Sequence, residues 1–182
     1  MQELSLNILD VANNSIRANA TLVQISIAED SIKNLLAIKI SDNGCGMDEE
    51  QLQLVQDPFF TTRTTRNVGL GIPLFKMSAI MSGGNFEISS KLNEGTCVAA
   101  TYKLNHIDRV PMGDITSTFV TLVGGSPDVD FVMSYCVDGN CLKVDTRQFK
   151  EILGDIPLNS PEILAFISDY IKEILAPINP KS

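Results

Sequence analysis

The sequence lacks a long apolar segment, a targeting signal and an excess of basic charge. No apolar run approaches the ~20 residues that a helix needs to cross a bilayer, and residues 1–4 carry no basic stretch followed by an apolar core. Only 14 Lys and Arg stand against 22 Asp and Glu, which gives a net charge of -8. Because nonspecific nucleic-acid binding needs a basic face, we expect a cytoplasmic protein that binds neither nucleic acid nor membranes.

Cysteine is also scarce, at four residues in the chain. This number is more typical of reduced thiols than of a disulfide framework. Cys136 and Cys141 flank an Asp-Gly turn signal and could face each other across a hairpin, but a zinc ion would need two further ligands. Cys45 and Cys97 belong to separate segments and are expected to be small buried thiols.

The chain is nevertheless long and apolar enough to form a core, since 44% of its 182 residues are hydrophobic. Apolar spacing predicts helices over residues 3–19, 48–55 and 70–81, and strands over 23–27, 35–40, 85–91 and 96–104. Residues 57–67 have no usable periodicity and are expected to form a loop, and Gly83 and Gly84 are expected to end the third helix. This order predicts an α+β protein, a two-layer sandwich with helices on one face of a mixed β-sheet.

Residues 105–182 are predicted to form a small α+β C-terminal extension of the domain at residues 1–104. Alternation indicates strands over 116–123, 130–137 and 142–144. Pro161 begins a helix whose apolar residues form one broad stripe, so the chain ends in an amphipathic helix. This stripe either packs on the preceding strands as an ordinary core or forms a docking surface.

Three polar or glycine-rich segments occur in an order that favours one nucleotide pocket. Asp42 follows a strand-like run and precedes a Gly-x-Gly turn, and Asp10 and Asn14 lie one turn apart on one face of the first predicted helix. Gly69 and Gly71 precede another helix, whose first N–H groups and dipole favour phosphate. Each signal alone is weak, but few folds need all three together.

These segments carry a resemblance to the Bergerat-fold, or GHKL, ATPases and kinases, which include DNA gyrase, heat-shock chaperones, histidine kinases and MutL. Residues 9–21 (LDVANNSIRANAT) resemble the MutL version of the N box, and residues 42–47 (DNGCGM) resemble the first glycine box. Residues 57–63 (DPFFTTR) and 69–72 (GLGI) are similar to the phenylalanine box and second glycine box of sensor histidine kinases, and Gly95-Thr96 is similar to the last short box. The resemblance implies a histidine-kinase-like ATP-binding domain.

The resemblance implies ATP and Mg²⁺ as cofactors and gives the matched residues their expected roles. Asn14 offers a neutral oxygen suited to magnesium, although a buried asparagine can also simply bridge helices. Asp42 is expected to receive the adenine amino group beside Gly46, although an aspartate can also simply begin a turn. The expected nucleotide-binding residues are Asn14, Arg17, Asp42, Gly44, Gly46, Met47, Phe60, Thr61, Arg63, Gly69, Leu70, Gly71, Ile72 and Thr96.

Asp10 departs from the family pattern, because members that hydrolyse ATP usually place a glutamate there as the general base. An aspartate is one methylene shorter, and a ~1 Å displacement of a catalytic group can cost on the order of a hundredfold in rate. We therefore expect slow hydrolysis at best. In a kinase, Asp10 would act as the base for the acceptor side chain or within the magnesium shell.

Two functions of different class fit the sequence. The first is a small regulator of the anti-sigma or split histidine kinase type, which binds Mg-ATP and transfers phosphate to a separate protein partner. The second is an ATP-dependent switch or binding module with weak or no turnover. ATP or ADP is the expected small-molecule partner in both, and a homodimer is compatible with either.

Overall fold

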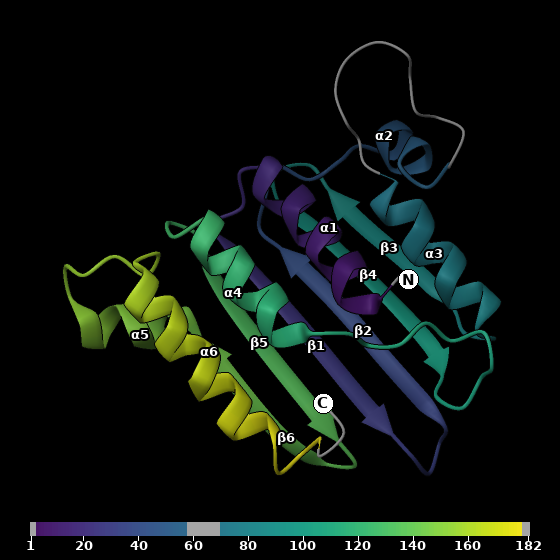
Figure 1. Cartoon of the computed structure of the whole chain (residues 1–182). Coiled ribbons are helices and arrows are strands. Elements are labelled where there is room, and N and C mark those ends of the chain that lie inside the picture. The colour runs from purple at the N-terminus through teal and green to yellow at the C-terminus, as the bar shows by residue number, and fades with distance from the viewer. Residues whose placement is uncertain (1–2, 58–69, 180–182) are drawn as a thin grey trace.

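The structure is a computed structural model that describes residues 3–57 and 70–179 (Figure 1). Most of the predicted loop at residues 57–67 therefore lies outside the described residues. The elements are α1 (Leu4–Arg17), β1 (Leu22–Asp30), β2 (Leu35–Asp42), α2 (Glu49–Leu54), α3 (Gly71–Met81), β3 (Phe86–Lys91), β4 (Gly95–Lys103), α4 (Ile115–Gly125), β5 (Asp130–Val137), β6 (Asn140–Asp145), α5 (Thr146–Leu153) and α6 (Pro161–Leu175).

Within these residues, six strands form one mixed sheet in the order β3-β4-β2-β1-β5-β6. Neighbouring strands are antiparallel except β1 and β5, which are parallel. Helix α1 contacts α3 and α4, α4 contacts α6, and these helices cover one face of the sheet (Figure 1). The α+β class and the layer of helices on a mixed sheet are confirmed.

The core lies between the sheet and these helices, because alternate strand residues are apolar and face the helical layer. At its β4 end, Tyr102 is fully buried with its hydroxyl 3.2 Å from the Ser78 hydroxyl of α3. Burial raises the pKa of the Tyr102 phenol, so this side chain stays neutral at physiological pH. The strand residues of the core cluster are Val23, Ile25, Ile27, Leu36, Ile38, Ile40, Val98, Ala100, Tyr102, Phe131, Met133, Tyr135, Leu142 and Val144.

The segment at residues 116–123, predicted as a strand, is instead part of α4. Its β-branched residues favour a strand, but the Asp114 side chain caps the helix by accepting a hydrogen bond from the Ser117 backbone N–H at 2.8 Å. Phe119 and Leu122 are buried on one face of the resulting helix. The cap and the helical spacing therefore outweigh the β propensity.

The C-terminal strands continue the sheet of the N-terminal ones, because β5 pairs with β1 along eight residue pairs, from Leu22 with Asp130 to Glu29 with Val137. β5 and β6 form the predicted hairpin, and α6 begins at Pro161 as predicted. Asp138 and Gly139 both have positive φ, as a two-residue type I′ turn requires.

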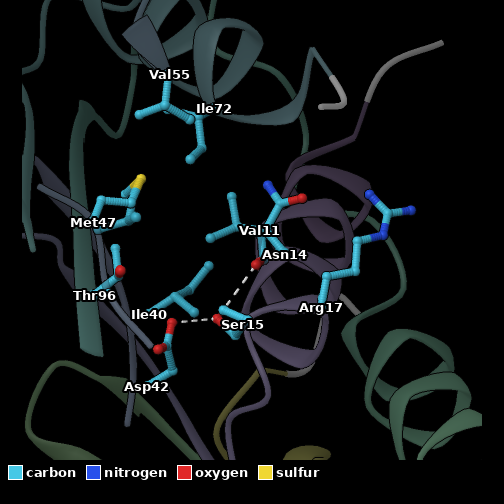
Figure 2. A pocket seen from close by; sticks show the side chains of 13 residues that line it. Val11, Asn14, Ser15, Arg17, Ile40, Asp42, Met47, Val55, Ile72 and Thr96 are labelled. Carbon is cyan, nitrogen blue, oxygen red and sulfur yellow. Dashed lines mark hydrogen bonds between the residues drawn. The ribbon is translucent and has the colours of Figure 1, made fainter. Parts of the chain in front are cut away.

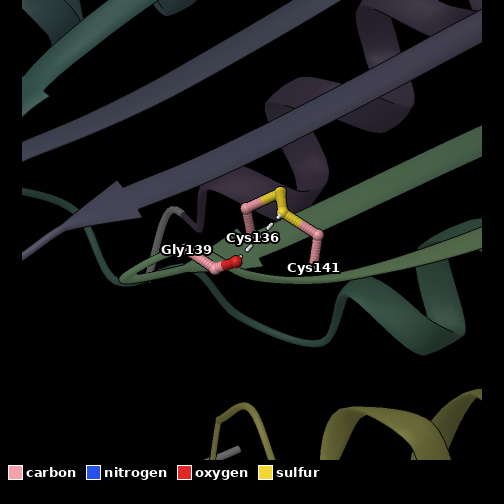
Figure 3. Close-up of a disulfide and its surroundings, with 3 residues drawn as sticks. All are labelled: Cys136, Gly139 and Cys141. Carbon is pink, nitrogen blue, oxygen red and sulfur yellow. Dashed lines mark hydrogen bonds between the residues drawn. A yellow bond between two sulfur atoms is a disulfide. The ribbon is translucent and has the colours of Figure 1, made fainter.

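The expectation of reduced thiols is wrong for Cys136 and Cys141, which form a disulfide (Figure 3). They are directly opposed in the β5–β6 pairing, so the hairpin itself brings the sulfur atoms together. Cys45 and Cys97 are free, as expected, but neither is buried, because Cys45 is exposed and Cys97 is partly exposed.

In the part of the chain that the structure describes, no helix combines the length and the apolar character that a bilayer span requires.

Candidate functional site

A cavity of about 510 Å³ lies between α1 and the helix-facing side of β2 and β4 (Figure 2). Such a volume falls within the ~300–1,000 Å³ of small-molecule sites. Most of its wall is apolar, and the polar groups come mainly from α1 and from the ends of β2 and β4. The lining residues are Val11, Asn14, Ser15, Arg17, Ala18, Ile40, Asp42, Gly46, Met47, Val55, Ile72, Thr96 and Val98.

Helix α1 forms one wall of the cavity because of its 3.6-residue period. Val11, Asn14, Ser15 and Ala18 recur at helical spacing and therefore share one face. Figure 2 shows the Asn14 amide and the Arg17 guanidinium extending from this helix on the side away from Asp42. Asn14 therefore lines the same cavity as Asp42 but points to another part of it, and the Arg17 guanidinium extends outward from the helix.

The Asp42 carboxylate is held in place on both of its oxygens. The Ser15 hydroxyl donates to Oδ2 at 2.6 Å (Figure 2), and the Gly44 backbone N–H donates to Oδ1 at 2.8 Å. Ser15 is itself buried, at 4% exposure, and Asp42 is partly exposed, so the hydrogen bond between α1 and β2 is partly shielded from water. A carboxylate has about four lone-pair sites, so Asp42 keeps acceptor capacity for a donor within the cavity.

Gly46 allows the loop after β2 to close against the β3–β4 hairpin. Its φ is +66°, and a Cβ at this position would lie 2.0 Å from the Lys91 carbonyl oxygen. No side chain fits there, so the loop can bring its backbone to the cavity edge only with glycine. This close approach explains the second glycine of the Asp-x-Gly-x-Gly segment.

A hydroxyl pair fixes the other side of the cavity. The Met47 backbone N–H donates to Ser90 Oγ at 2.8 Å, and Ser90 Oγ lies 2.8 Å from Thr96 Oγ1. The Met47 and Thr96 side chains consequently line the cavity together, opposite α1 (Figure 2).

The structure brings most of the predicted nucleotide-binding residues that it describes to this cavity. Asn14, Arg17, Asp42, Gly46, Met47, Ile72 and Thr96 all line it. Gly44, Leu70 and Gly71 do not line it, although Gly44 binds the Asp42 carboxylate. Phe60, Thr61, Arg63 and Gly69 lie outside the described residues.

Asp10, the predicted catalytic residue, is exposed and does not line the cavity. It lies where α1 meets the first turn of α3, because a Cβ built at Gly71 would come within 2.9 Å of the Asp10 Cβ. Gly71 therefore lets the two helices approach closely beside this carboxylate.

The prediction from sequence missed Val11, Ser15, Ala18, Ile40, Val55 and Val98 as lining residues. For most of these residues, the helical or strand periodicity of the sequence already indicated that they face the same side as a predicted site residue. Val11 and Ser15 share the helix face of Asn14, and Ile40 points to the same side of β2 as Asp42, two residues later.

Among the described residues, no group of three or more His, Cys, Asp or Glu side chains is placed to hold a metal ion. Asn14, half-buried at the cavity, offers a single neutral oxygen. This donor set does not suit a dedicated metal cage, but it suits a magnesium ion that takes its remaining ligands from water and phosphate.

The fold and cavity have the form of a GHKL ATPase domain, and comparison with known families agrees. Residues 2–106 match the family of histidine kinase-, DNA gyrase B-, and HSP90-like ATPases. The match covers more than half of the chain, which therefore belongs to this family, as the resemblance of the sequence segments predicted.

The curated relatives are much longer proteins. Sporulation kinase D of Bacillus subtilis is 32% identical over 94 residues, which cover 52% of this chain and 18% of the relative. The non-motile and phage-resistance protein of Caulobacter vibrioides is 30% identical over 122 residues, 62% of this chain and 14% of the relative. The chain therefore spans less than a fifth of the length of either relative.

A solved structure supports the fold. The Aquifex aeolicus MutL ATPase domain complexed with ADP superposes with a TM-score of 0.51 at 15% sequence identity, over 80% of this chain and 66% of that chain. The chain thus combines the sequence features of histidine-kinase-like ATPases with a fold similar to that of the MutL ATPase domain.

Proposed function

We propose that residues 1–104 bind Mg-ATP in the cavity beside α1. The observation that carries this proposal is the Asp42 carboxylate, whose orientation is set by Ser15 and Gly44 at the edge of an apolar cavity. An apolar slot with one oriented acceptor suits a flat base that bears an exocyclic amine. In the solved MutL neighbour, the comparable domain holds ADP.

Asn14 is our proposed magnesium ligand, and Arg17 is our proposed contact for the phosphates. Both residues line the cavity, and their side chains extend away from Asp42, so the proposed base end and the proposed phosphate end lie apart (Figure 2). A guanidinium and a metal-bound amide oxygen complement phosphate charge.

We further propose that the protein is a kinase-like regulator, which transfers phosphate to a separate protein partner, with residues 105–182 as its extension. ATP would supply the transferable phosphoryl group, and Asp10 would accept the proton of the acceptor side chain. The exposure of Asp10 supports this role, because a carboxylate on the surface can reach a side chain of another protein. The kinase relative supports the same class.

A second candidate function is an ATP-dependent switch with weak turnover. The position of Asp10 favours this second function. Asp10 does not line the cavity, and its side chain is shorter than that of a glutamate. A carboxylate outside the cavity would position the attacking water poorly for ATP hydrolysis, whereas ATP binding would persist.

Two variants separate binding from turnover. Asp10→Asn keeps the side-chain size and should retain ATP affinity, while phosphotransfer or hydrolysis falls by about 10²–10⁴-fold. Asn14→Ala removes the proposed metal oxygen, so the magnesium-dependent part of ATP affinity should fall about tenfold or more. Calorimetry with and without Mg²⁺ measures the affinity, and labelled ATP with candidate partner proteins measures the transfer.

Asn13→Ala is the matched control, because Asn13 is on the same helix but does not line the cavity. It should bind ATP as the parent does. Equal losses of ATP affinity in the Asp10 and Asn14 variants would refute the base role. A parent that binds ATP but neither hydrolyses it nor transfers phosphate would establish the switch instead.

A further inference from the structure

The Cys136–Cys141 disulfide lies outside the proposed nucleotide site and has no role there. It joins facing residues of β5 and β6 across a five-residue separation, next to the turn at Gly139 (Figure 3). Cys136 pairs with Ala28 across β1, whereas Asp42 pairs with Val23 at the other end of that strand. The disulfide and the cavity therefore lie toward opposite ends of the sheet.

The hairpin is held in place without the disulfide. Asp138 accepts hydrogen bonds from the Ser31 backbone N–H at 2.7 Å and from the Ser31 hydroxyl at 2.8 Å. The Asp138 backbone N–H also donates to the Glu29 carbonyl at 2.9 Å. These bonds fasten the hairpin tip to the β1–β2 turn.

The cross-link consequently adds little structural constraint. A disulfide stabilises a fold mainly by restricting the unfolded chain, and this effect is smallest for a short loop. Here the loop is one that the type I′ turn at Asp138 and Gly139 already closes. A disulfide stabilises a fold more when it joins segments that are distant in the sequence.

The two cysteine residues differ in their exposure to solvent. Cys141 is exposed on β6, which is the last strand of the sheet in the described part of the chain, whereas Cys136 is only partly exposed on β5. An incoming thiolate therefore reaches the Cys141 sulfur more readily. The Gly139 carbonyl oxygen, 3.9 Å from Cys141 Sγ, is placed to accept a weak hydrogen bond from the thiol once it is reduced.

We propose that Cys136 and Cys141 form a thiol–disulfide exchange site, whose co-reactant is a dithiol reductant. One thiolate of the dithiol attacks Cys141 Sγ, the S–S bond breaks, and Cys136 leaves as a thiolate that takes up a proton. The second thiol of the reductant then attacks the mixed disulfide and releases Cys141, which is also protonated. The site gains two electrons and two protons, the reductant becomes a disulfide, and the reverse reaction reoxidises the hairpin.

Differential alkylation of the folded, full-length protein tests this proposal. The protein is equilibrated with reduced and then with oxidised dithiothreitol without denaturant, alkylated, and its cysteines are mapped by mass spectrometry. We expect Cys136 and Cys141 to become reactive and then protected together, with an unchanged circular dichroism spectrum. Reduction that occurs only at urea concentrations that unfold the chain would overturn the proposal, and so would failure of the reduced pair to reoxidise.

Single variants test the direction of attack. In Cys136→Ser, the remaining Cys141 should form a mixed disulfide with oxidised glutathione about tenfold faster than Cys136 does in Cys141→Ser. Cys97→Ser is the control and should leave reduction of the hairpin pair unchanged. Equal rates in the two hairpin variants would refute attack at Cys141.

Discussion

The Asp42 carboxylate can only accept hydrogen bonds, and this property determines which base it suits. Asp42→Asn introduces an amide N–H₂ group that must face either the Ser15 hydroxyl, the Gly44 N–H or the cavity. We expect the preference for ATP over GTP to fall at least about tenfold, because an acceptor for the adenine amine is lost. Competition calorimetry with both nucleotides measures this preference.

Asp48→Asn is the matched control, since it removes the same charge. Asp48 caps α2 by accepting from the Gln51 backbone N–H at 2.8 Å, and asparagine caps a helix equally well. The control should keep the parent's nucleotide preference. If Asp42→Asn also kept it, Asp42 would not be the residue that reads the base.

Gly46 and Gly125 should respond in opposite ways to the same substitution. In Gly46→Ala the new Cβ would meet the Lys91 carbonyl at 2.0 Å, at a φ of +66°, so we expect the free energy of unfolding to fall by about 2 kcal/mol or more. Gly125 ends α4 with nothing within 4 Å of its built Cβ, so Gly125→Ala should be neutral or stabilise by up to about 1 kcal/mol. Urea unfolding measures both, and equal effects would refute the close approach at Gly46.

At the scale of elements, α5 begins with a charged cap that makes stability depend on pH. Asp145 is 6% exposed and binds the Arg147 side chain at 2.9 and 2.7 Å. The side-chain hydrogen bonds from Arg147 hold the pKa of the Asp145 carboxyl below its usual range. The ionised Asp145 carboxylate therefore stabilises the folded state at pH values above the pKa that Asp145 has in the unfolded chain. This stabilisation is lost as pH falls through the lower pKa that Asp145 has in the folded state.

Asp145→Asn should therefore destabilise the protein by about 1–2 kcal/mol at pH 7, since the ion pair is lost. The difference from the parent should begin to shrink as pH falls below about 4, because the carboxyl of the unfolded parent then takes up a proton, and it should be lost as pH falls through the lower pKa of the folded state. Urea unfolding at pH 7 and at pH 3 measures the difference. Asp169→Asn, at an exposed position on α6, is the control, and a pH-independent difference for Asp145→Asn would contradict the titration.

The sequence predicted most elements well where one physical signal dominated. Period-2 alternation placed β1, β2 and β5, and Pro161 marked the start of α6. The error at α4 arose because Thr116, Thr118 and Val120 favour a strand locally, whereas the Asp114 cap and packing against α1 and α6 select a helix. The disulfide could not be predicted from composition, because it depends on the register of the β5–β6 pairing.

The candidate site could be predicted only where residues have special chemistry. Asp42, Asn14 and Gly46 stand out in sequence, and all three line one cavity. Ser15 does not stand out, because a serine on a helix has many ordinary roles, and only the folded α1 places it 2.6 Å from Asp42. The division at residue 104 stays a prediction, although the sheet is shared by both parts.

At the scale of the whole molecule, this shared sheet makes a test of that division possible. A chain that ends at residue 106 would lose Phe131, Met133 and Tyr135 from the core and would expose β1 as an edge strand. We expect the truncated protein to aggregate and to unfold without a cooperative transition. Circular dichroism, size-exclusion chromatography and urea unfolding beside the full-length chain measure this. A truncated chain that folds cooperatively would establish that the N-terminal part folds as an independent domain.

The parallel pairing of β1 with β5 also has a consequence for the growing chain on the ribosome. Leu22 pairs with Asp130, which is translated about a hundred residues later, and so roughly 5–20 s later at ordinary elongation rates. During this interval β1 has no partner on one side, and the apolar Val23, Ile25 and Ile27 face an incomplete core. The time that translation takes from β1 to β5 therefore sets how long chaperones must protect the nascent protein from aggregation.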